Sequence, residues 1–365
     1  MRRALLLLSA LFLPNLFFIP QANAVQEIVI TEPTHRLSDG VFIDDQLAQK
    51  LLPNGELGLL VFSSVQGVRS WQVDPATISE IVAMSNGYGI SDGSTPTGQQ
   101  TAKEWLAQFI RVTKNEKVSV LTYGNPSAFW VDQIINKQIT YIDANGKISL
   151  ETVLGKATNQ SLIKNKKKQG ISKQNINLLN YAQRQINLLA TVVDQKELLS
   201  YQLRLAQILN PDIEKEIFSS LLKDYDKSIT DLRNKLKVTK TRFTVTSTKE
   251  ELPITLVNDF DQSIDLKLSV RALNSKVVVA STQQIRLEAK SKQQVLLPIE
   301  VLASGESSLL AQLTNLENKP VGYPVTINLK LSVISPVATW ITSGAAVLLF
   351  VAAIIQSVRR VRRRK

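Results

Sequence analysis

Cysteine is absent from this chain, and histidine occurs only once, at position 35. Without cysteine the protein has no disulfides and no thiolate chemistry, so an exported part must be stabilised by packed cores. A Ser-His-Asp triad or a His-rich metal site would have to use His35. That residue lies in a polar stretch near the expected mature N-terminus, which predicts a histidine at the surface. The sequence therefore predicts no metal site and no cofactor.

Acidic residues are scarce relative to basic ones, 31 against 43, which gives a net charge of +12. A strongly basic chain usually suggests a nucleic-acid partner. Most of this excess, however, lies at the two ends: Arg2 and Arg3 near the start, and RRVRRRK at residues 359–365. The part between them is only mildly basic, so we expect no nucleic-acid partner.

The start of the chain has the pattern of a secretory signal. Two arginines precede an apolar stretch, and Ala22-Asn23-Ala24 supplies the small-x-small pattern that signal peptidase cleaves. We therefore interpret residues 1–24 as a signal peptide and expect the mature chain to begin at Val25.

The other end has the pattern of a membrane anchor, because residues 337–358 contain no charged side chain. A helix of this length crosses a hydrocarbon core about 30 Å thick, since each residue adds about 1.5 Å. Trp340 would lie at the outer interface, and basic residues beside a span stay in the cytoplasm. These basic residues are Arg359, Arg360, Arg362, Arg363, Arg364 and Lys365. The sequence therefore predicts a single-pass protein of the cell membrane. Its tail, residues 359–365, would be cytoplasmic and most of the chain extracytoplasmic.

Residues 25–160 alternate strand-like and helix-like segments, which indicates a parallel sheet covered by helices. Within this region the run GELGLLVFSS, residues 55–64, predicts a buried strand because its centre is apolar. The region is too short for a complete barrel. We interpret it as a truncated, partial-barrel-like α/β domain.

Two further regions follow. Residues 161–239 contain two apolar stripes at helical spacing, separated at Asn210-Pro211, and predict a pair of antiparallel helices. Residues 240–335 change to period-two alternation, which is typical of an immunoglobulin-like or fibronectin-like β-sandwich. The sequence as a whole thus predicts a multi-domain α+β protein with a single C-terminal transmembrane helix.

The run RFTVTSTKEELPITLVNDFDQSIDLKLSV, residues 242–270, is the most specific of several stretches that carry a resemblance. It resembles the membrane-proximal β-domain of a family of actinobacterial membrane proteins of uncharacterised function. The runs VFIDDQLAQKLL, WQVDPATISEIVAMSNGY, AKEWLAQF and LTYGNPSAFW look like the end of its large extracytoplasmic domain. The resemblance implies longer relatives with a fuller glycosidase- or deacetylase-like region, encoded beside the lipid-II flippase. This chain looks like a shortened member. Where the family pattern favours an acid, it has Asn125.

Glycan chemistry needs two carboxylates across a sugar, or a bound metal. Asp44, Asp45 and Asp74 are the weak catalytic candidates, because the ends of parallel strands line the usual α/β crevice. Ligand-binding candidates are aromatic or amide side chains that would serve equally well in a core or at a rim. They are Trp71, Tyr88, Tyr123, Asn125 and Trp130.

Asp74 also has a structural interpretation. The stretch Val73-Asp74-Pro75-Ala76 is matched by residues 124–127 and 209–212, each with Asp or Asn before proline. This order suits a helix N-cap followed by proline at the first helical position. Two of the three copies use asparagine, which caps a helix but cannot act as an acid or base. We therefore predict that Asp74 caps a helix.

The function predicted from these features is that of a non-catalytic binding or assembly module of the cell envelope, related to cell-wall glycan or lipid II. One alternative is a glycan hydrolase-like or deacetylase-like enzyme that uses carboxylates at the strand ends. Another is a structural docking partner of a membrane enzyme or flippase. The sequence favours a protein without catalysis, because a single histidine and a short barrel make a complete site hard to assemble.

Overall fold

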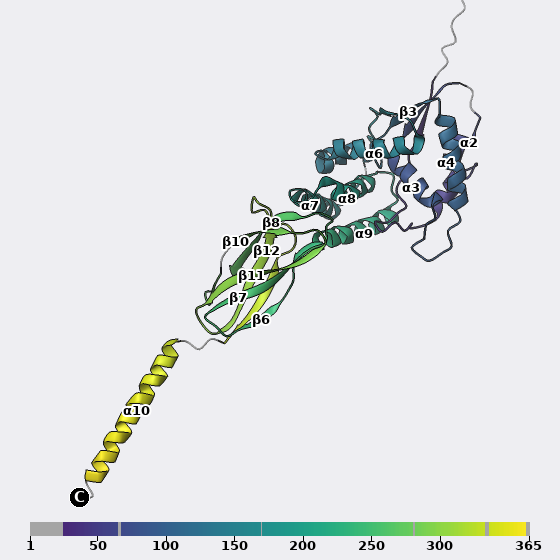
Figure 1. Cartoon of the computed structure of the whole chain (residues 1–365). Coiled ribbons are helices and arrows are strands. Elements are labelled where there is room, and N and C mark those ends of the chain that lie inside the picture. The colour runs from purple at the N-terminus through teal and green to yellow at the C-terminus, as the bar shows by residue number, and fades with distance from the viewer. Residues whose placement is uncertain (1–24, 65–66, 169, 280–281, 333–335, 363–365) are drawn as a thin grey trace, which may run out of the picture.

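The computed structural model describes residues 25–64, 67–168, 170–279, 282–332 and 336–362 (Figure 1). It is a mixed α+β protein, as the sequence predicted. The expected signal peptide, residues 1–24, lies outside the described residues.

The first region is built on a four-stranded sheet in the order β1-β2-β3-β4, and all three pairings are parallel. We call it the α/β region, and it contains the parallel sheet that the alternating pattern predicted. Its strands are β1 (Gln26–Ile30), β2 (Arg69–Val73), β3 (Lys117–Val120) and β4 (Asn159–Gln160). Its helices are α1 (Gln46–Leu51), α2 (Glu56–Phe62), α3 (Pro75–Ser85), α4 (Gln99–Thr113), α5 (Ala128–Trp130), the π-helix η1 (Val131–Ile135) and α6 (Ile139–Leu154).

The strand predicted within residues 55–64 is wrong, because this run forms helix α2. Its buried residues Leu57 and Val61 are four positions apart and therefore share a helix face. The carbonyl of Leu57 accepts a hydrogen bond of 2.9 Å from the indole of Trp105 on α4. A short apolar run does not distinguish a strand from a buried helix, and here tertiary packing decides for the helix.

Three helices, not the predicted pair, follow the α/β region, and we call them the helical layer. They are α7 (Lys173–Leu189), α8 (Gln195–Ile208) and α9 (Lys215–Asn234). The first apolar stripe continues past the end of α7 to the buried Val193. The sequence pattern therefore did not indicate that α7 ends and that α8 begins after its N-cap, Asp194. Asn210 does not cap α9, whose N-cap is Glu214. It turns the chain instead, since its side-chain oxygen accepts from the backbone N–H of Asp212 at 2.9 Å.

Two sheets follow, and we call them the two-sheet region. One has five strands in the order β10-β8-β12-β13-β6, and the other has four in the order β5-β7-β11-β9. Buried and exposed residues alternate along β11, as period two predicted. The strands are β5 (Leu236–Val238), β6 (Arg242–Val245), β7 (Lys249–Asn258), β8 (Ile264–Ala272), β9 (Val277–Val279), β10 (Thr282–Leu287), β11 (Ser291–Val301), β12 (Gly305–Thr314) and β13 (Val325–Leu331).

Two apolar cores hold these parts together. One lies within the α/β region, around Trp71, Trp105 and Phe109. The other runs continuously from Trp130 through the helical layer and into both later sheets. The helical layer therefore packs on the two-sheet region and also contacts the α/β region.

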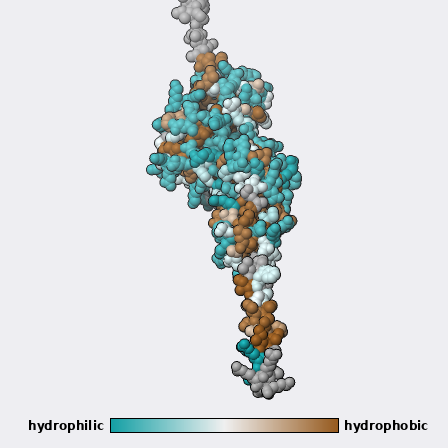
Figure 2. All heavy atoms as spheres, turned by 90° about the vertical axis from the view of Figure 1, so that its left-hand side faces the viewer, coloured by the Kyte–Doolittle hydropathy of each residue, from teal (hydrophilic) through white to brown (hydrophobic). Residues whose placement is uncertain are grey.

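The last helix, α10 (Pro336–Arg362), extends away from the rest of the protein (Figure 1). Within the described residues it is the one helix long and apolar enough to cross a membrane, over Trp340–Ser357. Figure 2 shows its apolar surface at the opposite end of the molecule from the α/β region, whose surface is largely hydrophilic. Arg359 and Arg360 follow this segment on the same helix, which ends at Arg362. Arg363, Arg364 and Lys365 lie outside the described residues.

Candidate functional site

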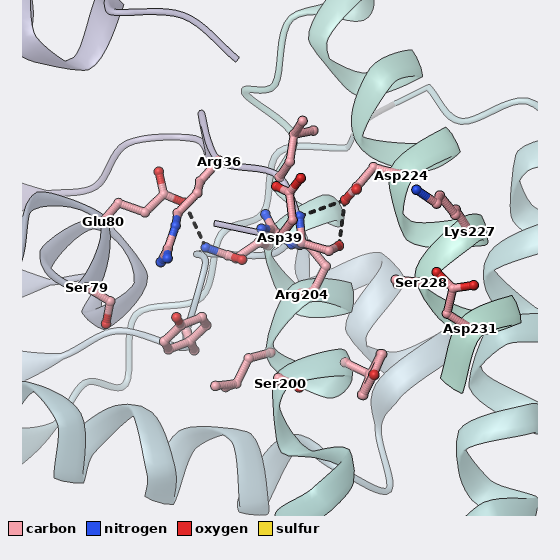
Figure 3. A pocket seen from close by; sticks show the side chains of 16 residues that line it. Arg36, Asp39, Ser79, Glu80, Ser200, Arg204, Asp224, Lys227, Ser228 and Asp231 are labelled. Atoms are coloured by element: carbon pink, nitrogen blue, oxygen red, sulfur yellow. Dashed lines mark hydrogen bonds between the residues drawn. The ribbon is translucent and has the colours of Figure 1, made fainter. Parts of the chain in front are cut away.

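A polar cavity of about 440 Å³ lies where the carboxyl edge of the parallel sheet faces α8 and α9 (Figure 3). The loop after β1 and helix α3 form one wall, and the two helices form the other. The charged and amide side chains that line it are Arg36, Asp39, Glu80, Arg204, Gln207, Asp224, Lys227 and Asp231. Figure 3 shows Arg36 and Glu80 on one side, and Asp224, Lys227 and Asp231 on the other.

Glu80 is a buried residue that lines this cavity, and both of its carboxylate oxygens accept hydrogen bonds from the protein. One oxygen accepts from the hydroxyl of Thr34 and, at 3.0 Å, from the side-chain amide of Gln207. The other accepts from the backbone N–H of His35 at 3.1 Å. Glu80 therefore joins α3 to the loop after β1 and to α8, and it is already satisfied as a hydrogen-bond acceptor.

Arg204 reaches the cavity from α8 and is 9% exposed. Its guanidinium donates to the hydroxyl of Thr34 at 3.0 Å. Among the described residues, no carboxylate oxygen lies within 4.0 Å of it. Burial lowers the pKa of this guanidinium. The cavity therefore contains a buried cation without a direct counter-ion.

Asp224 connects α9 to the loop after β1. One of its carboxylate oxygens accepts from the backbone N–H of Ser38 at 2.8 Å and from the Ser38 hydroxyl at 2.5 Å. The two walls of the cavity are thus held together by polar contacts at Asp224, at Glu80 and at Arg204, which donates to Thr34.

Asp74 caps helix α3, as predicted, and its side chain does not line the cavity. It is fully buried, and one oxygen accepts from the backbone N–H of Ala76 at 2.9 Å and of Gly124 at 2.8 Å. The other oxygen accepts from the hydroxyl of Thr77 at 3.3 Å. Burial raises the pKa of Asp74 to about 7. The carboxyl group therefore joins the ends of β2 and β3 and does not face a ligand.

The sequence predicted that His35 lies at the surface, and this is wrong, because the residue is only 3% exposed. Its Nδ1 lies 2.9 Å from Asp44 and its Nε2 lies 3.3 Å from Glu32, which also pairs with Lys50 at 2.6 Å. Burial alone would lower the pKa of His35, but the hydrogen bonds to Asp44 and Glu32 outweigh it and raise the pKa to about 9. Asp44, a catalytic candidate, is therefore engaged in a partly buried ion pair. The loop around His35 has no periodicity that could have indicated this burial.

The third aspartate, Asp45, also has protein partners. It accepts from the backbone N–H of Thr97 at 3.1 Å and from the Thr97 hydroxyl at 2.6 Å. It also accepts a hydrogen bond from the hydroxyl of Tyr88. Tyr88, one of the ligand-binding candidates, therefore uses its hydroxyl in a contact within the protein. None of the three candidate aspartates lines the polar cavity.

Only one of the other ligand-binding candidates, Tyr123, lines the polar cavity. Burial raises the pKa of its hydroxyl to about 12. Trp71 is fully buried in strand β2 against Phe109, and this excludes it from stacking on a sugar. Trp130 is also buried in the core. Asn125 does not cap a helix, although its place before proline predicted a cap, because α5 has Ser127 as its N-cap. Asn125 has a left-handed φ of 45° and lines a second cavity of about 240 Å³ beside η1.

The cavity residues that the sequence did not identify come mainly from the helical layer. Arg204 and Gln207 lie on α8, and Asp224 lies on α9. Apolar stripes indicate which face of a helix is buried, but they do not identify the polar side chains at the edge of that face. The one signal available was the placement of Arg204 and Gln207 three positions apart, and therefore on one helix face.

These observations define a mixed α+β protein with a polar cavity at the edge of a parallel sheet and one helix apolar enough to cross a membrane. The chain belongs to the family described as "Family of unknown function (DUF6049)", whose sequence model matches residues 149–364. The match begins within α6 and continues into the basic tail. No curated protein matches the chain.

Solved structures that are similar to part of the chain cover about a quarter of it. WR4, a member of the MSP family from C. elegans, is 13% identical over 27% of this chain and 97% of its own, with a TM-score of 0.21. The E. coli chaperone DraB is 13% identical over 27% of this chain, with a TM-score of 0.21, and the match spans 57% of DraB. The CARDB domain of a Pyrococcus furiosus protein is 14% identical over 27% of this chain and 90% of its own, with a TM-score of 0.21. Scores this low carry no argument about function.

Proposed function

We propose that this protein is a single-pass, membrane-anchored module of the cell envelope that binds a polar ligand in its cavity without catalysing a reaction. The ligand class is cell-wall glycan or a related lipid-II glycan. Helix α10 and the basic residues Arg359 and Arg360 after its apolar segment support the anchor. The cavity would then be extracytoplasmic, and the basic tail would be cytoplasmic.

One observation carries the non-catalytic part of the proposal: the acids at the sheet edge are already engaged by protein donors. Glu80 accepts three hydrogen bonds, and Asp74 is a buried helix cap. Glycoside hydrolysis needs two carboxylates that face the sugar across the scissile bond. Neither of these acids is free for that role.

The cavity supports binding because it is concave, of ligand size and rich in hydrogen-bonding groups. Sites for small molecules occupy roughly 300–1,000 Å³ and commonly occur between domains or at the carboxyl ends of parallel strands. Hydroxyl groups from Ser79, Ser200 and Ser228 line this one beside the charged side chains. Sugar hydroxyls are both donors and acceptors, so they match such a mixed surface.

The finer architecture belongs to the same proposal. The sequential order of the four parallel strands supports a shortened barrel, because neighbouring strands of a complete barrel also follow in sequence. The mainly antiparallel two-sheet region supports an immunoglobulin-like β-sandwich. We also propose an actinobacterial origin and longer relatives, as the sequence resemblance implies.

The proposal is tested by retention of the full-length protein, in detergent micelles, on purified peptidoglycan glycan strands. Ser228 lines the cavity from α9, and its hydroxyl donates to the carbonyl of Tyr225. We expect Ser228→Trp to fill the cavity and reduce retention at least tenfold. Ser219→Trp is the matched control, because Ser219 is exposed on the same helix and donates to the carbonyl of Lys215. Its retention should equal that of the unmodified protein.

The same preparation distinguishes the alternatives. Release of sugar fragments or acetate that Asp74→Asn abolishes would establish an enzyme and contradict the proposal. Failure to retain glycan, together with co-purification of a membrane enzyme or flippase, would favour a docking partner. Retention that Ser228→Trp does not change would place the glycan outside the cavity and overturn this assignment.

A further inference from the structure

Two guanidinium groups face the polar cavity, and neither has a carboxylate partner. The Nε of Arg36 donates to the backbone carbonyl of Gly40 at 2.9 Å, and Arg204 donates to Thr34. Within the described ranges, no carboxylate oxygen lies within 4.0 Å of either guanidinium. Arg36 and Arg204 also act on each other electrostatically, since the charge of Arg36 lowers the pKa of Arg204 in addition to the effect of burial.

The nearest acids compensate these charges only through space. The negative charges of Glu80 and Asp224 raise the pKa of Arg204, although neither carboxylate contacts its guanidinium. Glu80 is engaged by Thr34, Gln207 and His35, and Asp224 is engaged by Ser38. A buried charge that lacks a hydrogen-bonded counter-ion is unfavourable, so an anion at this position would stabilise the site.

We propose that Arg36 and Arg204 bind the anionic group, a carboxylate or a phosphate, of a sugar-sized ligand in the polar cavity. This inference rests on the proposed function and adds the charge of the ligand to it. The planar fork of a guanidinium matches the oxygen pairs of both groups, and burial strengthens the interaction. Arg204 provides the buried contact, and Arg36 provides the contact from the opposite wall.

The rest of the cavity fits the neutral part of such a ligand. Asp231, Ser228 and Lys227 line the side formed by α9, and Tyr123 and Ser79 line the side of the sheet. These groups supply acceptors, donors and one aromatic face for a ring with several hydroxyls. The anionic end would therefore lie between the two arginines, and the ring would lie toward α9.

Three sugars that share one ring test the inference: N-acetylglucosamine, N-acetylmuramic acid and N-acetylglucosamine 1-phosphate. The first is neutral, the second carries a carboxylate and the third a phosphate. Binding to the full-length protein in micelles is measured by isothermal titration calorimetry. We expect at least one of the anionic sugars to bind tenfold or more tightly than the neutral one, and the better of the two identifies the anion.

Arg204→Gln should remove this preference while the neutral sugar binds as before, and Arg36→Gln should reduce it. Arg271→Gln is the control, because Arg271 is exposed on β8 far along the chain from the cavity residues. Tryptophan fluorescence and circular dichroism establish that each variant is folded. If Arg204→Gln does not fold, Arg36→Gln decides alone, because Arg36 is only partly buried.

Equal affinity for the three sugars would overturn the anion inference and leave glycan binding intact. A preference for the anionic sugars that persists in both cavity variants would also overturn it, because the anion would then bind elsewhere. No binding of any of the three would overturn it too, and the retention experiment with Ser228→Trp would then decide the proposed function separately.

Discussion

At the scale of single residues, a partly buried charged cluster connects the loop after β1 to helix α1. It consists of Glu32, His35, Asp44 and Lys50. The imidazole lies between two carboxylates, so it is held as a cation through neutral pH. The cluster fixes the loop that carries Thr34 and Arg36, and it therefore positions one wall of the polar cavity.

We predict that His35→Gln destabilises the α/β region in a pH-dependent way. The folded-state pKa of about 9 lies above the ordinary 6.5, so protonation of His35 stabilises the fold fully below pH 6.5. This stabilisation is lost as the pH rises through 9 and amounts to on the order of 3 kcal/mol. The measurement is urea unfolding of both proteins between pH 6 and pH 10, followed by tryptophan fluorescence. A difference between them that stays constant with pH would contradict the prediction.

Asp74 gives a pH dependence of the same sign in a lower pH range, because its pKa is also raised in the folded state. Its folded-state pKa of about 7 lies above the ordinary 3.8, so stability from the protonated carboxyl is lost as the pH rises through 7. Asp74→Asn keeps the acceptor for the N–H groups of Ala76 and Gly124 but carries no charge. We expect it to gain stability relative to the unmodified protein between pH 4 and pH 8. Asp74→Ala should lose about 1–2 kcal/mol, because the cap is removed.

Thermal unfolding of the three proteins at both pH values checks this prediction. An asparagine variant as unstable as the alanine variant at pH 8 would show that the negative charge itself is required. In that case Asp74 would be more than a cap.

The cap at Asp74 could be predicted from sequence, whereas the environments of His35 and Arg204 could not. A cap depends on residues adjacent in the chain, and the Asp-Pro pair predicted it at Asp74, although the same pattern at Asn125 and Asn210 does not cap a helix. The partners of the His35 imidazole lie up to nine residues away in an irregular loop, and Thr34 is 170 residues from Arg204. Such contacts exist only after the loop and α8 have packed on the sheet.

At the scale of elements, Gly124 is the junction between the sheet edge and the helical layer. Its backbone N–H donates to Asp74 at 2.8 Å, and its carbonyl accepts from the side-chain amide of Asn210 at 2.9 Å. Its φ is +77°, and a Cβ added there would lie 2.7 Å from the Cα of Gln207. The close approach of β3 and α8 therefore requires glycine.

Gly124→Ala is expected to destabilise the fold by about 2 kcal/mol or more, because it adds steric overlap to the strain of a left-handed φ. The control is Gly93→Ala, because Gly93 has a φ of +78°, nearly that of Gly124, but a Cβ added there would have no described atom within 4 Å. The free energy of unfolding of Gly93→Ala should fall only by the cost of the left-handed φ. Urea unfolding of both variants measures the difference, and equal losses would show that the contact with Gln207 is not tight.

The elements themselves were predictable where the pattern was long. The alternation along β8, β11 and β13 specified strands because it extends over several residues on each face. Helix α2 was mistaken for a strand because seven apolar-rich residues fit either form. The break between α7 and α8 was missed because the apolar stripe continues through the turn, where Val193 is also buried.

At the scale of the whole molecule, the regions follow one another from α10 to the α/β region (Figure 1). The order of three regions after the expected signal was predictable, since each has its own periodicity. The cavity was not, because it forms only where the first region packs on the second. Which face of the membrane this assembly occupies is a prediction from the basic residues after the span.

The absence of cysteine makes that topology directly measurable. We predict that Asp92→Cys, in an exposed loop, reacts with a membrane-impermeant maleimide in intact cells. Lys365→Cys should react only after the cells are permeabilised, because basic residues beside a span remain in the cytoplasm. The unmodified protein is the negative control, since it contains no thiol. Labelling of position 365 in intact cells, with none at position 92, would reverse the proposed orientation.

The two-sheet region also determines how far the cavity lies from the membrane. Strands such as β11, with 11 residues, run along the line from α10 toward α9 (Figure 1) and measure about 35 Å at the usual rise of about 3.3 Å per residue. With α10 across a bilayer, the cavity stands more than one strand length above the lipid headgroups. Surface charge decays over about 8 Å at physiological ionic strength, so the potential of the bilayer does not reach the arginines. The proposed anionic ligand therefore has to extend from the membrane to the height of the cavity in order to reach Arg36 and Arg204.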